Sequence, residues 1–139
     1  VGAWVAIREE ISFTSLLLGA AVVFWLIGFD ILYACMDVEA DRGNRLHSVP
    51  ERFGIATALK MAFASHVLMV IFLLVLWEPT VLLGWVYLSG VALVTGLLVY
   101  EHSLIKKDDL SKVNMAFFNV NGIISIGLMA FVIVDCLWL

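Results

Sequence analysis

Long apolar stretches separated by short polar segments are the feature that most restricts how this chain can fold. A membrane-spanning helix needs about 20 predominantly apolar residues, and four stretches of the chain reach that length. They are Ile11–Tyr33, Ile55–Trp77, Thr80–Tyr100 and Val113–Val134. A shorter apolar segment, Val1–Ile7, has the composition of the tail of a preceding helix. The sequence therefore predicts an all-α integral membrane protein, a transmembrane bundle with four full spans.

The overall composition supports a membrane protein and disfavours other classes. Of the 139 residues, 63% are hydrophobic and 14% are charged, whereas a soluble domain has about 45–50% apolar and about 25% charged residues. The sequence has no basic tract with interleaved aromatic residues, so we expect no nucleic-acid partner. Cys35 and Cys136 lie in apolar stretches and form no metal-binding pattern, so we expect inert core thiols rather than a disulfide or a zinc site.

The distribution of lysine and arginine predicts how the spans are oriented. With four spans, the polar segments Arg42–Gly54 and Glu101–Lys112 lie on the same side of the membrane. Together with Lys60, which follows closely, they contain seven of the eight basic residues, and only Arg8 lies on the other side. Because basic loops stay on the cytoplasmic side, we expect both segments to be cytoplasmic in a bacterial inner (plasma) membrane.

Three aspartates at helical spacing mark the first candidate site. We expect the helix of the first span to continue to about Asp41, which places Asp30, Asp37 and Asp41 on one helix face. Asp37 and Asp41 are an i,i+4 like-charge pair, which destabilises a bare helix. A divalent cation would offset this repulsion, and Mg²⁺ is typically held by one or two carboxylates with phosphates and water. The alternative interpretation is a solvated helix end.

Tyrosine and basic residues near these acids extend the site. Tyr33 precedes Asp37 by one turn, and Arg42, Arg52 and Lys60 follow in or just after the polar loop. Carboxylates beside cations at a membrane surface suggest a site for a metal and a diphosphate, in which the basic side chains neutralise the remaining charge. The alternative for each basic residue is that it only sets the topology.

Polar residues also occur within the spans. Asn114 and Asn121 share a face of the fourth span, where they either link helices through hydrogen bonds or line a cavity and contact substrate. His66 is expected to be a core histidine with its hydrogen bonds satisfied. The role of His102, at the mouth of the third span, is left open between a structural residue and a ligand.

Three segments together resemble the UbiA-type membrane prenyltransferases, and in particular the 4-hydroxybenzoate polyprenyltransferases. They are GFDILYACMDVEADRGNRLHSVPERFG, YEHSLIKKDDLSKVN and AFFNVNGIIS. The resemblance implies a bundle of about nine membrane helices, in which two aspartate-rich motifs face each other across a cavity open to lipid. Each motif binds Mg²⁺, and together they hold a polyprenyl diphosphate. Asp37 and Asp41 are similar to the metal-binding acids of the second motif.

The resemblance also implies a function, and it implies that this chain alone lacks part of the active site. The implied reaction is Mg²⁺-dependent transfer of a polyprenyl group to a hydroxyaryl carboxylate such as 4-hydroxybenzoate, in ubiquinone or menaquinone biosynthesis. Arg52 is a candidate for binding either the carboxylate of this acceptor or the diphosphate. The first aspartate-rich motif of the family, of the type N-D-x-x-D, is absent from this sequence. Residues 1–139 therefore resemble the C-terminal part of a single transmembrane domain. We expect them to be inactive without an N-terminal half.

Two rival functions follow from the same acids. The CDP-alcohol phosphotransferases also use D-x-x-x-D acids and a metal, but nothing like their D-G-x-x-A-R pattern precedes Asp37. A non-enzymatic transporter or channel subunit would use Asp30 and the asparagines to line a cation path. The polar, proline-containing loop after Asp41 argues against that alternative.

Overall fold

The chain folds into helices throughout the part that can be described. The computed structural model describes residues 1–38, 47–80, 82–105, 110 and 119–138, and no strand occurs among them. The helices are α1 (Gly2–Arg8), α2 (Phe13–Ala34), α4 (Val49–Phe53), α5 (Ile55–Trp77), α6 (Trp85–Leu104) and α8 (Asn121–Trp138). The predicted all-α class is confirmed.

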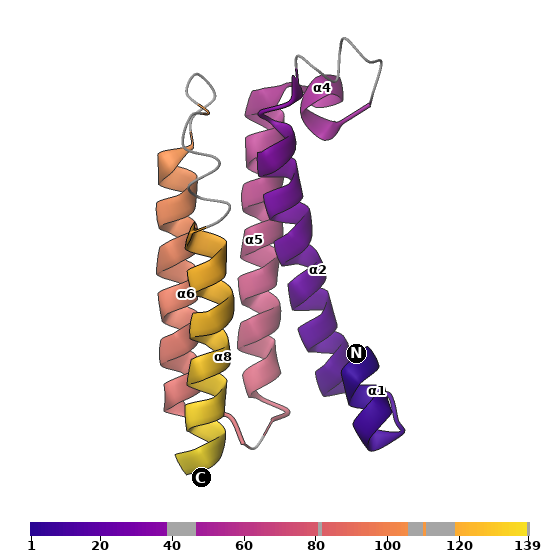
Figure 1. Cartoon of the computed structure of the whole chain (residues 1–139), viewed down its shortest axis with the longest axis vertical. Helices are drawn as coiled ribbons and strands as arrows, with labels where there is room; N and C mark the ends of the chain where they lie inside the picture. The colour runs from indigo at the N-terminus through magenta and orange to yellow at the C-terminus, as the bar shows by residue number, and fades with distance from the viewer. Residues whose placement is uncertain (39–46, 81, 106–109, 111–118, 139) are drawn as a thin grey trace.

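Four long helices form two antiparallel pairs that lie side by side (Figure 1). α2 packs along α5, α6 packs along α8, and α5 joins the two pairs by contacting α6. The short helix α4 lies at one end, against α2 and α5. The C-terminal ends of α2 and α6 thus lie at the same end of the bundle, and α5 ends and α6 begins at the opposite end.

The outer surface of the bundle is apolar, as a lipid-facing surface should be. Large hydrophobic side chains are exposed on every long helix, including Phe13, Ile71, Val99 and Ile126. α2 and α5, with 22 and 23 residues, are long and apolar enough to cross a membrane, and α8 has a shorter apolar stretch. Length and composition together thus support two of the four predicted spans, and the other two remain a prediction.

One core joins all four long helices. Ala21 of α2, Leu73 of α5, Val94 of α6 and Ile124 of α8 are each 1% exposed and belong to one hydrophobic cluster. Nearer α4, a second cluster contains Ile31, Leu32, Cys35, Ala58, Ala62 and Ile105. Ala58 and Ala62 are completely buried, and their small side chains let α2 and α5 approach closely.

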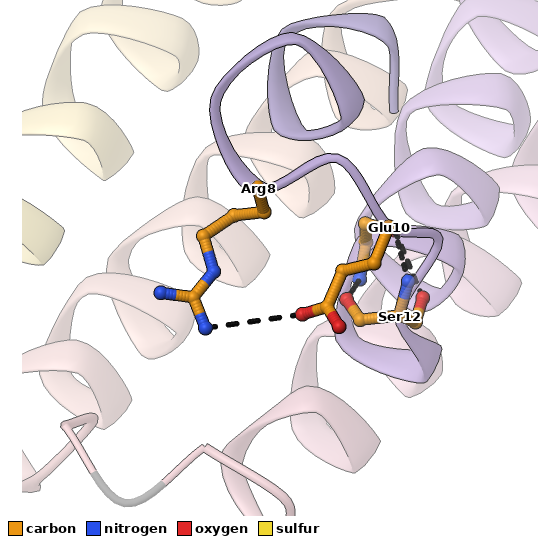
Figure 2. Close-up of polar contacts among 4 residues, drawn as sticks. Arg8, Glu10 and Ser12 are labelled. Atoms are coloured by element: carbon orange, nitrogen blue, oxygen red, sulfur yellow. Dashed lines mark hydrogen bonds and ion pairs between the residues drawn. The ribbon is translucent and has the colours of Figure 1, made fainter.

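The entry into α2 is fixed by a capping box, which Figure 2 shows beside an ion pair. The Ser12 hydroxyl accepts a hydrogen bond from the Ser15 backbone N–H at 3.1 Å, and Ser15 Oγ accepts one from the Ser12 N–H at 3.3 Å. These bonds satisfy N–H groups that a helix N-terminus otherwise leaves unpaired. Arg8 and Glu10 form an exposed ion pair at 3.8 Å, which contributes little to stability.

The predicted continuation of the first span to Asp41 is wrong. α2 ends at Ala34, and Asp37 lies in a bend. The N–H groups of Met36 and Asp37 bond to the carbonyls of Tyr33 and Ala34, three residues back, which tightens the last turn and ends the α-helix. Repulsion between Asp37 and Asp41 on a continued helix would also have opposed it.

Three smaller expectations also need correction. The third span begins at Trp85 rather than Thr80 and continues to Leu104, so Glu101 lies in a helix and not in a polar connection. The apolar residues Leu104 and Ile105 pack on the second cluster, which explains why the helix continues. Both cysteines are free, and Cys35 is buried as expected, but Cys136 is exposed on the apolar surface of α8.

Candidate functional site

The acidic end of α2 carries the first group of predicted site residues. Asp30 and Tyr33 lie on the last two turns of α2, and both are exposed. Asp37 follows the helix end and is also exposed. These three side chains therefore reach the surface at the end of the bundle that carries α4 (Figure 1). The shared helix face predicted for Asp30 and Asp37 does not form, because the helix ends between them.

Helix α4 places a basic residue at the same end. Pro50 is the second residue of this short helix and is buried, whereas Arg52 in its last turn is exposed. The Arg52 guanidinium lies 5.4 Å from the centre of the Phe53 ring. His47 Nδ1 and Glu51 Oε2 are 3.6 Å apart, and with Arg52 they line a polar hollow of about 420 Å³.

Lys60 adds a second cation near this end. It lies in the second turn of α5, which begins directly after α4, and its side chain is exposed. The structure thus brings Asp37, Arg52 and Lys60 to the same end of the bundle. Asp41, Arg42 and Asn114 lie outside the described residues.

The carboxylate at this end is a ligand that suits a hard cation, but the described residues alone do not supply enough ligands to hold one. Within residues 1–38, 47–80, 82–105 and 119–137, no three His, Cys, Asp or Glu side chains are close enough to hold a metal. Asp37 offers exposed carboxylate oxygens, the ligand type that Mg²⁺ prefers. The residues present are compatible with Mg²⁺ held jointly with further oxygen ligands.

A second polar cluster lies inside the bundle, and the sequence interpretation missed it as a unit. Asn121 Oδ1 accepts a hydrogen bond from the Trp25 indole N–H at 3.0 Å, which links α8 to α2. This bond supports the interpretation of Asn121 as a link between helices. Between α5 and α6, His66 Nδ1 and His102 Nε2 are 2.9 Å apart, so one of these two imidazoles donates to the other.

Glu101 completes this internal cluster. It is only 1% exposed, and the Asn121 amide lies beside its carboxyl group. Glu101 Oε2 itself makes no close hydrogen bond among the described residues, whereas the His66 ring lies beside the Trp25 backbone. His66 is therefore a core residue as expected, bonded to His102 through Nδ1 and lying beside the Trp25 backbone. The apolar run Leu104–Ile105 after Glu101 was the sequence signal that this residue lies inside a helix.

Comparison with known proteins finds a matching family and several similar proteins. The sequence pattern described as "UbiA prenyltransferase family" matches residues 1–123. The 4-hydroxybenzoate octaprenyltransferase of Cupriavidus metallidurans is 32% identical over 124 residues, which cover 86% of this chain and 40% of that protein.

Two further relatives bear the same name. The protein from Marinobacter nauticus is 31% identical over 119 residues, covering 86% of this chain and 40% of its own. The protein from Hydrogenovibrio crunogenus is 27% identical over 131 residues, covering 91% and 45%. The chain thus spans about 40% of the length of the first of these relatives. No solved structure matches the chain.

Proposed function

Because the chain belongs to the UbiA prenyltransferase family, we propose that the whole protein transfers a polyprenyl group from a polyprenyl diphosphate to an aromatic acceptor. The acceptor is a hydroxyaryl carboxylate such as 4-hydroxybenzoate, and the product enters ubiquinone or menaquinone biosynthesis. The observation that carries this proposal is the family match over residues 1–123, which includes the acidic segment after α2. The relatives at 32% and 31% identity, both named 4-hydroxybenzoate octaprenyltransferase, support the acceptor class.

The proposed diphosphate site lies at the end of the bundle that carries α4. Asp37 and Asp41 would hold Mg²⁺, which neutralises charge on the departing diphosphate when bound. The exposed side chains of Arg52 and Lys60, with Arg42, would contact the diphosphate oxygens and stabilise the same charge. Asp30 lies about one turn before Ala34, the last residue of α2, and Tyr33 directly precedes Ala34. Both would support this site from the end of that helix.

The isoprenoid chain requires an apolar path into the bundle. A cavity of about 320 Å³ lies between α2, α5 and α8, and its walls include Trp25, Leu73 and Ile124. Apolar walls of this kind would hold the isoprenoid and keep water away from the allylic cation formed when the C–O bond breaks. Asn114 and Asn121 on the fourth span are our candidates for contacts to the acceptor, in addition to the link that Asn121 makes to Trp25.

The site residues can be tested in the full-length protein. Asp37→Asn and Asp41→Asn should each lower transfer by more than about 100-fold, because Asn keeps the size of Asp but removes the charge that binds the metal. Asp30→Asn should have an intermediate effect. Glu78→Gln makes the same charge change on an exposed residue after α5, at the opposite end of the bundle, and should leave activity unchanged.

Binding measurements separate the metal site from the chemistry. Polyprenyl diphosphate binding should be titrated against Mg²⁺ for each variant in nanodiscs. Both acid variants should lose the Mg²⁺ dependence that the wild type and Glu78→Gln show. If they bind the diphosphate with unchanged Mg²⁺ dependence, these acids are not the metal site.

A second part of the proposal concerns the extent of the chain. We propose that residues 1–139 are the C-terminal part of one transmembrane domain in a bacterial inner membrane. They would supply one of two metal-binding motifs, so the isolated chain should show no transfer activity in lipid. Co-expression with the N-terminal half of the same protein should restore it. Turnover by the isolated chain would contradict this part of the proposal.

A further inference from the structure

Helix α1 folds back against α2 and touches it at a glycine. Residues 9–12 join the two helices, and α1 lies beside the first part of α2 (Figure 1). A Cβ atom on Gly19 would lie 2.9 Å from Cγ2 of Val1. Trp4, one turn after Val1, is half-buried, whereas the other residues of α1 are exposed. Val1 and Trp4 thus mark the side of α1 that packs on α2, and the two helices are antiparallel.

Gly19 belongs to a row of residues that runs along one side of α2. The members of this row are Leu16, Gly19, Val23, Leu26 and Asp30. They follow each other at steps of three or four residues, so they lie on one helix face. Such spacing is typical of the contact line between two packed helices. All of them are exposed except Gly19, where Val1 packs. We refer to this row as the Leu16–Asp30 stripe.

The bundle itself uses other sides of α2. Leu17 and Ala21 belong to the core, and Gly28 lies against the His66 imidazole of α5. Gly28 is about 200° round the helix from Leu26. The stripe therefore faces either lipid or another part of the protein. Asp30 favours protein, because an acid in a membrane-spanning helix almost always faces the interior of a bundle or a water-filled cavity.

The relatives indicate which part of the protein is available to cover the stripe. This chain spans only 40% of the length of the relative from Cupriavidus metallidurans, and we have proposed that an N-terminal half precedes it. Since α1 and α2 are antiparallel, a helix that continued α1 beyond Val1 would run along α2 toward Asp30. Both helices rise about 1.5 Å per residue, so the fourth, seventh and eleventh residues before Val1 would come opposite Val23, Leu26 and Asp30.

We infer that the Leu16–Asp30 stripe is the docking surface for the helix of the same protein that ends in α1. The close contact at Gly19 sets the approach of the two helices, and Val23 and Leu26 pack against the part of that helix before Val1. The same contact shields Asp30 from lipid. This inference rests on the proposed extent of the chain, and it is independent of the proposed transfer reaction.

The test is disulfide cross-linking in the full-length protein, without other cysteines, in its membrane. A protease site is inserted between Glu9 and Glu10, which are exposed and lie between α1 and α2. Leu26→Cys is combined with a cysteine at the seventh residue before Val1, and the membranes are oxidised. A disulfide forms only where the two Cα atoms are less than about 7 Å apart. We therefore expect the two fragments to stay joined after cleavage and to separate when a reductant is added.

The matched control moves one cysteine to the other side of the preceding helix. A cysteine at the ninth residue before Val1 lies about 200° round that helix from the seventh, so with Leu26→Cys the fragments should separate. Val23→Cys with a cysteine at the fourth residue before Val1 is an independent pair that should stay joined.

Two results would overturn the inference. One is the separation of the fragments for both pairs. The other is a disulfide-linked dimer of whole chains before cleavage, which would assign the stripe to a second copy of the protein. Transfer activity of the same cysteine-free protein tests the proposed function separately, because cross-linking does not require turnover. Failure of the docking inference and failure of the proposed function are thus distinguishable.

Discussion

Asp135 of α8 accepts a hydrogen bond from the backbone N–H of Tyr87, 3.0 Å away, in the first turn of α6. The same oxygen accepts a hydrogen bond from the N–H of Gly84, the residue before that helix. The first N–H groups of a helix have no partner within it, and a carboxylate also suits the positive end of the helix dipole. Asp135 therefore caps α6 from another helix, which explains how an acid is kept 5% exposed.

Removing this cap should destabilise the bundle. Asp135→Ala leaves two backbone N–H groups unpaired and should lower the free energy of unfolding by about 2 kcal/mol. Asp135→Asn keeps one acceptor oxygen and should cost less. Thermal unfolding of the full-length protein in detergent measures both, with Glu78→Ala, which changes an exposed acid directly after α5, as the control. Equal midpoints for Asp135→Ala and Glu78→Ala would show that the cap contributes nothing.

The sequence correctly predicted the long apolar helices, because their formation depends on the average composition of a stretch. Apolar length alone located α2 and α5 to within a few residues, because any helix that crosses a membrane must satisfy its backbone hydrogen bonds internally. The acidic end of α2 was predicted less well. Periodicity placed Asp30 and Asp37 on one face, but periodicity has meaning only while the helix continues, and the tightened turn after Ala34 ends it.

The internal polar cluster could not have been predicted from local patterns. Trp25 and Asn121 are 96 residues apart in sequence and His66 and His102 are 36 apart, so their pairing depends on how the two helix pairs pack. Glu101 is a charged residue next to a polar segment, as is typical of a loop, and its burial depends on contacts with α8. Asp135 likewise has a role only because α8 ends beside the start of α6.

Gly28 is predicted to be required for the packing of α2 on α5. A Cβ atom there would overlap the imidazole of His66 and lie 3.1 Å from the Ala62 carbonyl. Gly28→Ala should therefore cost about 1–3 kcal/mol through overpacking. Gly96→Ala is the matched control in α6, because a Cβ there meets nothing within 4 Å, and alanine favours a helix by about 1 kcal/mol.

Unfolding midpoints in detergent compare the two glycine variants. Gly28→Ala should unfold at a lower temperature than the wild type, and Gly96→Ala at the same or a higher temperature. A Gly28→Ala protein as stable as Gly96→Ala would mean that α2 and His66 can move apart without cost. The close approach of these helices would then not be required.

Cys35 is predicted to be unreactive until the protein unfolds. Burial raises the pKa of the Cys35 thiol to about 11, whereas an exposed thiol has a pKa of about 8.5. Only the thiolate is nucleophilic, so at pH 8 Cys35 should react with iodoacetamide more than about 100-fold more slowly than an exposed cysteine. Both proteins compared carry Cys136→Ser. The first keeps Cys35, and the second carries Cys35→Ser together with Thr57→Cys, since Thr57 is exposed in the first turn of α5.

The pH dependence of labelling provides a second check on Cys35. Raising the pH from about 8 to about 9.5 should bring the reaction at Thr57→Cys close to its maximum rate, since its thiol is then mostly ionised. Over the same range, the Cys35 thiol stays mainly protonated, because its pKa of about 11 is higher. Labelling in SDS should make both cysteines equally reactive. Fast labelling of native Cys35 at pH 8 would contradict the buried position of this thiol.

The arrangement of the helix ends predicts the membrane topology. α2 and α6 end on the side of α4, and α5 and α8 begin there (Figure 1). Seven of the eight basic residues belong to or closely follow the segments at that end, so the positive-inside rule makes it cytoplasmic. Single cysteines at Asn44 and Asp108 in a cysteine-free full-length protein should therefore be labelled by an impermeant maleimide only in inside-out vesicles.

Glu78 supplies the control from the opposite end of the bundle. It follows the last residue of α5 and is exposed, so Glu78→Cys should be labelled only in right-side-out spheroplasts. Four spans require Asn44→Cys and Asp108→Cys to share one side and Glu78→Cys to have the other. If Asn44→Cys and Asp108→Cys react from opposite sides, α5 or α6 does not span the membrane. The site proposed around Asp37 and Arg52 would then lack the enclosing helices that exclude water from the reacting cation.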